Sequence, residues 1–200
     1  IMQSAMAGGE RISNLLDTEE RIPDTGKKSL PAAVAGRIEF DRVHFSYNPD
    51  EPVLRDLSFT IQPGETVAIV GYTGAGKTTI ANLLARMWDI QSGQIRIDGV
   101  ELRDIPLAEL RRAVQPVQQD VFMFAETITE NIRLGADIPE EKIREAAETV
   151  QAAPFIEQLP RGYDTYLSER GANLSTGQRQ LLSFTRVSAH DPRILILDEA

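Results

Sequence analysis

The residues from Gly71 to Thr79, with the sequence GYTGAGKTT, have the types and the spacing of a phosphate-binding loop. They match the pattern G-x-x-x-x-G-K-[ST] at Gly71, Gly76, Lys77 and Thr78. Glycines let backbone N–H groups curl around an anion, and a helix that begins there points its positive end at the same place. The pattern predicts a nucleotide site, in which Lys77 reaches the β- and γ-phosphates and the Thr78 hydroxyl binds Mg²⁺.

The rest of this loop is expected to line the nucleotide as well. The further candidate residues are Thr73, Gly74, Ala75 and Thr79. Some kinases bind phosphate with such a loop, and so do switch GTPases, DNA-handling ATPases and motors. The nine residues do not distinguish between these classes, so the choice depends on the other motifs in the chain.

A second candidate site lies in ILILDE, from Ile194 to Glu199, where two carboxylates follow an apolar run. An aspartate at the end of a buried strand can hold Mg²⁺ through water, so we assign Asp198 to the metal. Glu199 beside it is a candidate general base for the attacking water. Without a phosphate loop upstream, the same residues would equally fit an acidic strand end at the surface.

The stretch LSTGQ, from Leu174 to Gln178, predicts a helix start that could also bind an anion. Ser175 fits the N-cap position, and Gln178 three residues later completes a capping box. This helix N-terminus, with a hydroxyl and Gly177, would be a second anion site roughly 100 residues after the phosphate loop. One nucleotide does not need two such helix ends from distant segments of one domain, whereas two chains facing head to tail would use both.

The elements that must position these motifs begin with strands. RIEF and VHFSY alternate, with a slip of phase at Asp41-Arg42 that indicates a bulge or a turn, and LSFTI predicts another strand. TVAIV, from Thr66 to Val70, lacks alternation and predicts a strand buried on both faces directly before the phosphate loop. After that loop, apolar residues at helical spacing predict an amphipathic helix: Ile80, Leu83, Leu84, Met87 and Trp88.

Further along the chain, GQIRIDG predicts a short strand with an Asp-Gly turn, and residues 120–165 are expected to be mainly helical. Ser175 begins another helix that ends at His190-Asp191-Pro192, and RILIL predicts a second fully apolar strand. Residues 17–36 are polar, with two prolines and two glycines. This composition predicts a linker and a domain boundary near Gly36.

The composition limits the kinds of partner. The 200 residues carry a net charge of -9, and this acidic balance argues against a nucleic-acid partner, which usually needs a basic patch. There is no cysteine, which excludes disulfides and thiolate zinc sites and fits a cytosolic location. No run of about 18 apolar residues occurs, so nothing in these 200 residues spans a bilayer by itself.

In combination, these motifs resemble those of the ABC ATPases. LSTGQRQ is similar to the signature motif of that family, and the phosphate loop, the signature and ILILDEA occur in the family's order and spacing. The resemblance implies an α/β fold, a P-loop NTPase core of the ABC ATPase type with an antiparallel β subdomain and a helical subdomain, truncated after the Asp198 strand. It also implies hydrolysis of ATP with Mg²⁺, for which Lys77, Gln119 and Glu199 are the expected catalytic residues.

The resemblance assigns roles to individual residues. Tyr47 matches the aromatic residue that stacks on adenine, and Gln119 matches a glutamine that binds Mg²⁺, contacts the attacking water and couples the site to the membrane part. The signature residues Ser175, Gly177 and Gln178 would contact an ATP bound to another chain, where the first two cap its γ-phosphate. The implied partner is a second nucleotide-binding domain, identical or paralogous.

Two further stretches resemble exporters of this family. Glu169-Arg170-Gly171 matches a short loop that contacts the intracellular ends of transmembrane helices. AMAGGERISNLLD is similar to the end of the last transmembrane helix, although a free amphipathic helix would also fit. The implied domains are the end of that helix (1–20), a linker (21–36) and an incomplete ATPase domain (37–200) with a helical subdomain at about 120–190. The implied location is the cytoplasmic face of the inner membrane, in a multi-pass protein whose transmembrane domains export a substrate.

Some features depart from the family pattern. Thr176 stands where the family usually has glycine, which would weaken the signature or mark one half of a heterodimer. The expected D-loop and switch histidine lie beyond Ala200, because His44 and His190 both precede the Asp198 strand. A DNA-organising ATPase would have a long coiled coil between the two motifs, and none is predicted here. A soluble regulatory ABC protein, the other alternative, would have no reason to carry the N-terminal helix or the Glu169 loop.

Overall fold

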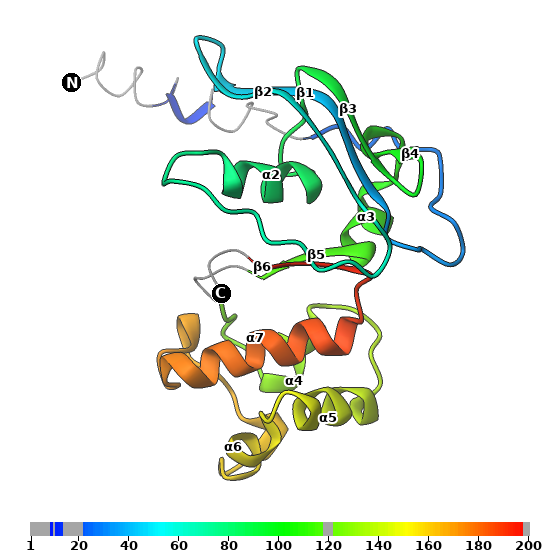
Figure 1. Cartoon of the computed structure of the whole chain (residues 1–200). Coiled ribbons are helices and arrows are strands. Elements are labelled where there is room, and N and C mark those ends of the chain that lie inside the picture. Colours follow the sequence, from blue (N-terminus) through cyan, green and yellow to red (C-terminus); the bar gives the residue numbers. More distant parts are fainter. Residues whose placement is uncertain (1–8, 10, 14–21, 118–121, 198–200) are drawn as a thin grey trace, which may run out of the picture.

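The computed structural model describes residues 9, 11–13, 22–117 and 122–197, and Figure 1 shows how their helices and strands are arranged. The strands are β1 Ile38–Asn48, β2 Glu51–Ile61, β3 Ser92–Ile97, β4 Val100–Glu101, β5 Val114–Val117 and β6 Ile194–Leu197. The helices are α2 Lys77–Leu84, α3 Leu107–Ala113, α4 Ile128–Arg133, α5 Glu140–Thr149, α6 Ala153–Glu157 and α7 Thr176–His190. None of the helices in the described ranges has both the length and the apolar character that a bilayer span needs.

The elements are stacked in layers (Figure 1). An antiparallel sheet with the strand order β2-β1-β3-β4 forms one end of the molecule, and α2 lies beneath it. The parallel pair β5–β6 follows, and helices α4 to α7 form the opposite end. The parallel pair therefore separates α2, which begins in the phosphate loop, from α7, which begins in the stretch LSTGQ.

Strand β1 runs through the middle of the antiparallel sheet and contains the bulge that the sequence predicts. Its register against β2 shifts between Phe40 and Val43, and Arg42 in this gap has a left-handed φ of 48°. In a regular strand, a spacing of three would put Phe40 and Val43 on opposite faces. Because of the bulge, both side chains and that of Phe45 are buried in one core.

Apolar side chains gather in two hydrophobic cores. The first lies between the antiparallel sheet and helices α2 and α3, and its most buried members are Val43, Leu83, Ile97, Ile105 and Leu110. The second joins helices α4 to α7, and its most buried members are Met123, Ile128, Ile132, Ile143, Ile156, Leu167 and Leu182. The two cores confirm the antiparallel β subdomain and the helical subdomain.

The expected strand Thr66–Val70 is wrong, because the structure assigns no strand there. Its side chains are exposed instead of buried, and Val70 is 88% exposed. A central strand exists through hydrogen bonds to neighbours on both sides. Among the described strands, β5 and β6 pair only with each other, so this apolar segment has no paired neighbour.

The helix after the phosphate loop is shorter than its apolar spacing predicts. Helix α2 ends at Leu84, and Arg86 takes a left-handed φ of 48°. Met87 and Trp88 therefore lie beyond the helix and are half-exposed. The left-handed backbone at Arg86 ends the helix, and the buried Arg86 side chain forms an ion pair with Asp89 at 3.1 Å.

Strand β5 has no counterpart in the elements expected from sequence. It pairs in parallel with β6, from Val114 opposite Ile194 to Val117 opposite Leu197. Pro116 within it lacks a backbone N–H, which makes a central strand an unfavourable interpretation of this stretch. The proline fits because β6 is the only strand that pairs with β5 among the described residues.

Residues 22–36, which we call the strap, form neither helix nor strand but are fixed to the first subdomain. The backbone N–H groups of Lys27 and Lys28 donate to the Asp104 carbonyl, and the Leu30 N–H donates to Glu109 Oε1 at 2.7 Å. The Leu30 side chain is buried in the first core. The strap therefore has a defined path across α3 and the turn before it.

Candidate functional site

The phosphate loop of this structure has the backbone geometry for which its glycines are needed. Gly74 and Gly76 have left-handed φ values of 83° and 87°. Gly76 is the N-cap of α2, and a Cβ atom built on it would lie 2.9 Å from a Leu54 methyl carbon. The loop from Gly71 to Ala75 is exposed, so its backbone is open to a ligand.

Lys77 folds back onto this loop. Its Nζ donates to the carbonyl oxygens of Gly71 at 2.9 Å and Tyr72 at 3.0 Å. These bonds hold a positive charge at the N-terminal end of α2, where the helix dipole also favours an anion. A phosphate that enters the loop would offer Lys77 anionic oxygens, which bind its ammonium group more strongly than two neutral carbonyls do.

The structure places Tyr47, the predicted adenine-stacking residue, next to helix α2. The Tyr47 hydroxyl donates to Thr79 Oγ1 at 3.3 Å, and Thr79 is buried in the first turn of α2. Tyr47 as a whole is 42% exposed. Thr79 thus connects Tyr47 to the phosphate loop, whereas the neighbouring Thr78 lies at the exposed surface.

The signature stretch forms the exposed N-terminal end of the 15-residue helix α7. The predicted capping box is confirmed, because Ser175 Oγ accepts from the Gln178 N–H and Gln178 Oε1 accepts from the Ser175 N–H. Nothing lies within 4 Å of a Cβ atom built on Gly177. The Thr176 hydroxyl accepts from Arg179 Nη2 at 3.1 Å, so a threonine fits here without a clash.

One chain does not bring the two helix ends together. The N-terminal ends of α2 and α7 lie on the same side of the molecule, but the pair β5–β6 lies between them (Figure 1). Leu83 of α2 belongs to the first core and Leu182 of α7 to the second. Lys77 and Ser175 are therefore parts of different subdomains.

Three predicted site residues, Gln119, Asp198 and Glu199, lie outside the described residues. The strands that precede them end together, since Val117 of β5 is the register partner of Leu197 of β6. Within the described ranges, no group of three histidine or carboxylate side chains could hold a metal ion. Of the predicted Mg²⁺ ligands, only Thr78 belongs to the part of the chain that the structure describes.

Two side chains that the sequence analysis missed hold the segment 122–127, which follows the predicted Gln119. The buried Asn131 amide donates to the carbonyls of Phe124, Glu126 and Thr127, and its oxygen accepts from the Phe124 N–H. Arg186 of α7 donates from Nη2 to the Phe122 carbonyl, and burial lowers the pKa of its guanidinium. The sequence does contain a sign of the role of Asn131, because it is a polar residue between Ile128 and Ile132 at a core-facing position of the helix.

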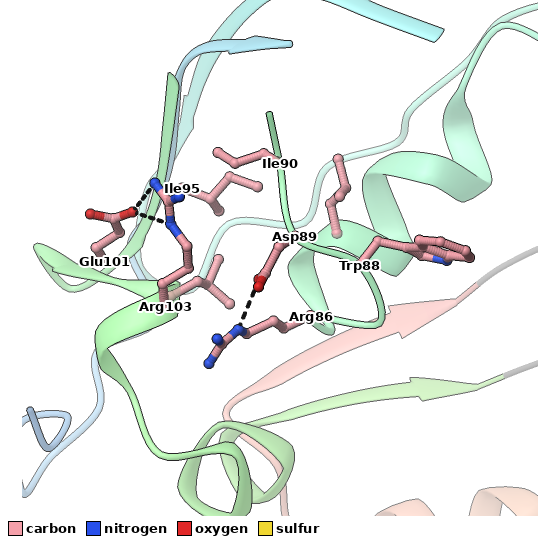
Figure 2. A pocket seen from close by; sticks show the side chains of 9 residues that line it. Arg86, Trp88, Asp89, Ile90, Ile95, Glu101 and Arg103 are labelled. Atoms are coloured by element: carbon pink, nitrogen blue, oxygen red, sulfur yellow. Dashed lines mark hydrogen bonds and ion pairs between the residues drawn. The ribbon is translucent and has the colours of Figure 1, made fainter. Parts of the chain in front are cut away.

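A small pocket lies at the C-terminal end of α2, and Leu83, Arg86 and Trp88 are among its lining residues (Figure 2). Its volume of about 10 Å³ is close to the minimum for one water molecule. Figure 2 shows the ion pairs Arg86–Asp89 and Arg103–Glu101 beside it. The pocket is too small for a nucleotide, so it is separate from the predicted site.

Comparisons with known proteins agree with the resemblance that the motifs suggest. The sequence model of a family described as ABC transporter matches residues 54–200. The chain is 44% identical over 200 residues to the fatty acid ABC transporter ATP-binding/permease protein of Mycobacterium tuberculosis. It is 45% identical over 201 residues to the ATP-dependent lipid A-core flippase of Chromobacterium violaceum. Each alignment covers 100% of this chain, but 31% and 34% of the two relatives.

A solved structure is also similar. The structure of a bacterial Atm1-family ABC exporter with ATP bound matches with a TM-score of 0.87 and 37% sequence identity. The match covers 98% of this chain and 35% of that protein. The chain thus spans about a third of the length of these relatives. The match confirms the expected P-loop fold, with an antiparallel sheet and a helical part.

Proposed function

Since the chain belongs to the ABC transporter family, we propose that it is the ATP-binding and ATP-hydrolysing domain of an exporter. The observation that carries this proposal is the pair of helix N-termini, of α2 and α7, which face the same side from different subdomains (Figure 1). Each helix end favours an anion. An ATP held between two such domains would use the α2 end of one and the α7 end of the other.

In this proposal, ATP binds with its phosphates in the loop from Gly71 to Ala75 and its adenine on Tyr47. Lys77 exchanges the Gly71 and Tyr72 carbonyls for phosphate oxygens. Thr78, Gln119 and Asp198 would hold Mg²⁺, which would neutralise charge on the phosphate oxygens. Glu199 accepts a proton from the attacking water, which makes it the catalytic base.

The second half of the site comes from another nucleotide-binding domain, a second copy of the chain or a paralogue. Its Ser175 and Gly177 cap the γ-phosphate, and Gln178 supports them through the capping box. The exposure of the α7 N-terminus supports this arrangement, because a second domain can reach it without unfolding anything. Closing and opening of the pair would drive alternating access in the attached membrane domains.

Three exposed aromatic side chains support the proposal that this domain has a contact surface for those membrane domains. Phe122, Phe124 and Tyr166 are 53%, 51% and 56% exposed, and the two phenylalanine rings pack edge to face at 5.0 Å. Exposed aromatic clusters are typical of contact sites. The proposed division is a helix end at 1–20, a linker at 21–36 and the ATPase domain at 37–200, on the cytoplasmic side of a multi-pass protein in the inner membrane.

The substitution Glu199→Gln in the full-length protein tests the proposed activity. It removes the base but keeps a side chain of the same size, so ATP binding should remain and turnover should fall about 100-fold or more. The measurements are equilibrium binding of Mg–ATP and release of inorganic phosphate. Glu141→Gln, on the exposed face of α5, is the matched control and should leave both unchanged. Turnover near wild type in Glu199→Gln would remove Glu199 from the role of base.

A further inference from the structure

Three aromatic rings from two distant segments meet beside the phosphate-loop helix. Phe45 and Tyr47 come from β1, and Trp88 comes from the turn after α2. The Tyr47 ring centroid lies 4.8 Å from that of Phe45 and 5.2 Å from that of Trp88. Both pairs are edge-to-face, with interplanar angles of 88° and 87°. Such perpendicular pairs are a favoured geometry for aromatic rings.

This arrangement restricts the Tyr47 ring without stacking another ring against it. Its hydroxyl is held by Thr79, and both neighbouring rings are perpendicular to it. A planar base would stack in the parallel orientation, which neither neighbour takes up. Tyr47 as a whole also stays 42% exposed, so a base can reach this residue from solvent.

The backbone on either side of Trp88 is fixed. On its N-terminal side, the Met87 N–H donates to the Asn82 carbonyl at 2.8 Å. On its C-terminal side, Asp89 is paired with Arg86, which is buried and also donates to the Pro23 carbonyl at 3.0 Å. Figure 2 shows the Trp88 ring pointing away from the Arg86–Asp89 pair. Trp88 therefore presents its indole from a rigid position at the C-terminal end of α2.

Trp88 is not a core residue in this structure. Its side chain is 48% exposed, although it was expected to lie on the buried face of a helix. Trp88 instead lies in a fixed turn, with its ring perpendicular to that of a candidate base-binding tyrosine. We propose that Trp88 is a positioning residue, which holds the Tyr47 ring in the orientation that stacks on the nucleotide base. This inference rests on the proposed function and adds a second aromatic residue to its nucleotide site.

The experiment compares two ligands in the full-length protein, Mg–ATP and Mg–tripolyphosphate, which has the phosphates but no base. If Trp88 acts through Tyr47, Trp88→Ala should weaken Mg–ATP binding by about three- to tenfold. Binding of Mg–tripolyphosphate should stay within about twofold of wild type, because the phosphate loop is untouched. Trp88→Phe keeps an aromatic edge and should restore most of the ATP affinity. Met87→Ala, at the adjacent half-exposed residue, is the matched control and should change neither affinity.

A double-mutant cycle with Tyr47→Ala then separates positioning from direct contact. If Trp88 acts through Tyr47, adding Trp88→Ala to Tyr47→Ala should cause no further loss of ATP affinity. Three results would overturn the inference: unchanged ATP affinity in Trp88→Ala, an equal loss for both ligands, or additive losses in the double variant. If the wild-type protein does not bind Mg–ATP, the proposed function fails. If the wild-type protein binds Mg–ATP and Trp88→Ala binds it equally well, the proposed function stands and only this inference is wrong.

Discussion

At the scale of single residues, Arg86 shows how distant parts of the chain are joined. Its side chain is only 2% exposed, yet it carries a permanent charge. Asp89 compensates that charge at 3.1 Å, and the carbonyls of Pro23 and Ile105 accept from the guanidinium. A buried charge is tolerated only with such partners. Arg86 therefore connects the end of α2 to both the strap and the turn before α3.

Arg86→Ala should lower the free energy of unfolding by about 3 kcal/mol, because it leaves a carboxylate and two carbonyls without their donor. Urea unfolding of the chain, followed by circular dichroism, measures this change. Arg103→Ala is the matched control in the same region, since the Arg103 side chain that pairs with Glu101 is 45% exposed. It should cost less than about 1 kcal/mol. Equal losses in the two variants would show that Arg86 is not a structural junction.

Residues that act through local spacing were predictable, and residues that act through distant contacts were not. The left-handed glycines of the loop and the capping box at Ser175 were predictable because each depends on neighbours within a few positions. Arg86 meets Pro23 across 63 positions, and Arg186 meets Asn131 across 55. No spacing rule links positions so far apart, so the sequence gives neither arginine a role.

At the scale of elements, α7 was predictable because its start depends on nearby residues, whereas the structure of Thr66–Val70 depends on distant ones. The start of α7 was predicted correctly because a capping box is local and satisfies its own backbone groups. The apolar run Thr66–Val70 indicated burial, but a strand also needs a hydrogen-bonding neighbour, and the run does not specify one. Strand β5 was missed for the related reason that its pairing with β6 depends on a segment about 80 positions away.

The strap is the element whose docking is most open to a direct test. Gly26 packs so closely that a Cβ atom on it would lie 2.3 Å from the Ile105 carbonyl carbon. Backbone atoms cannot rotate away from such an overlap, so Gly26→Ala should displace the strap. Hydrogen exchange of the Lys27, Lys28 and Leu30 amides should then be at least about tenfold faster than in wild type.

Ser29→Ala is the control for this experiment, because Ser29 is an exposed residue in the same segment and the change adds no atoms. It should leave the exchange of the three amides unchanged. Protection that persists in Gly26→Ala would contradict the close packing of the strap against Ile105.

At the scale of the whole molecule, the two hydrophobic cores place the two candidate phosphate-binding helix ends in different subdomains. The order of the motifs along the chain was sufficient to predict the family and its division into subdomains. It was not sufficient to predict how the helix ends are separated, because that separation depends on where β5 and β6 lie in the stack (Figure 1). A complete site, in our proposal, therefore forms only when a second domain approaches.

The pairing of the phosphate loop with the signature of a second copy can be measured by cross-linking. The 200 residues contain no cysteine, so Thr73→Cys in the loop and Thr176→Cys at the start of α7 introduce defined attachment points. In the full-length protein, freed of any other cysteine and carrying Glu199→Gln to retain ATP, a short bifunctional thiol reagent should yield a covalent dimer with Mg–ATP. Neither single-cysteine variant should yield it. A link within one chain, or no dimer while Mg–ATP is bound, would contradict the shared site.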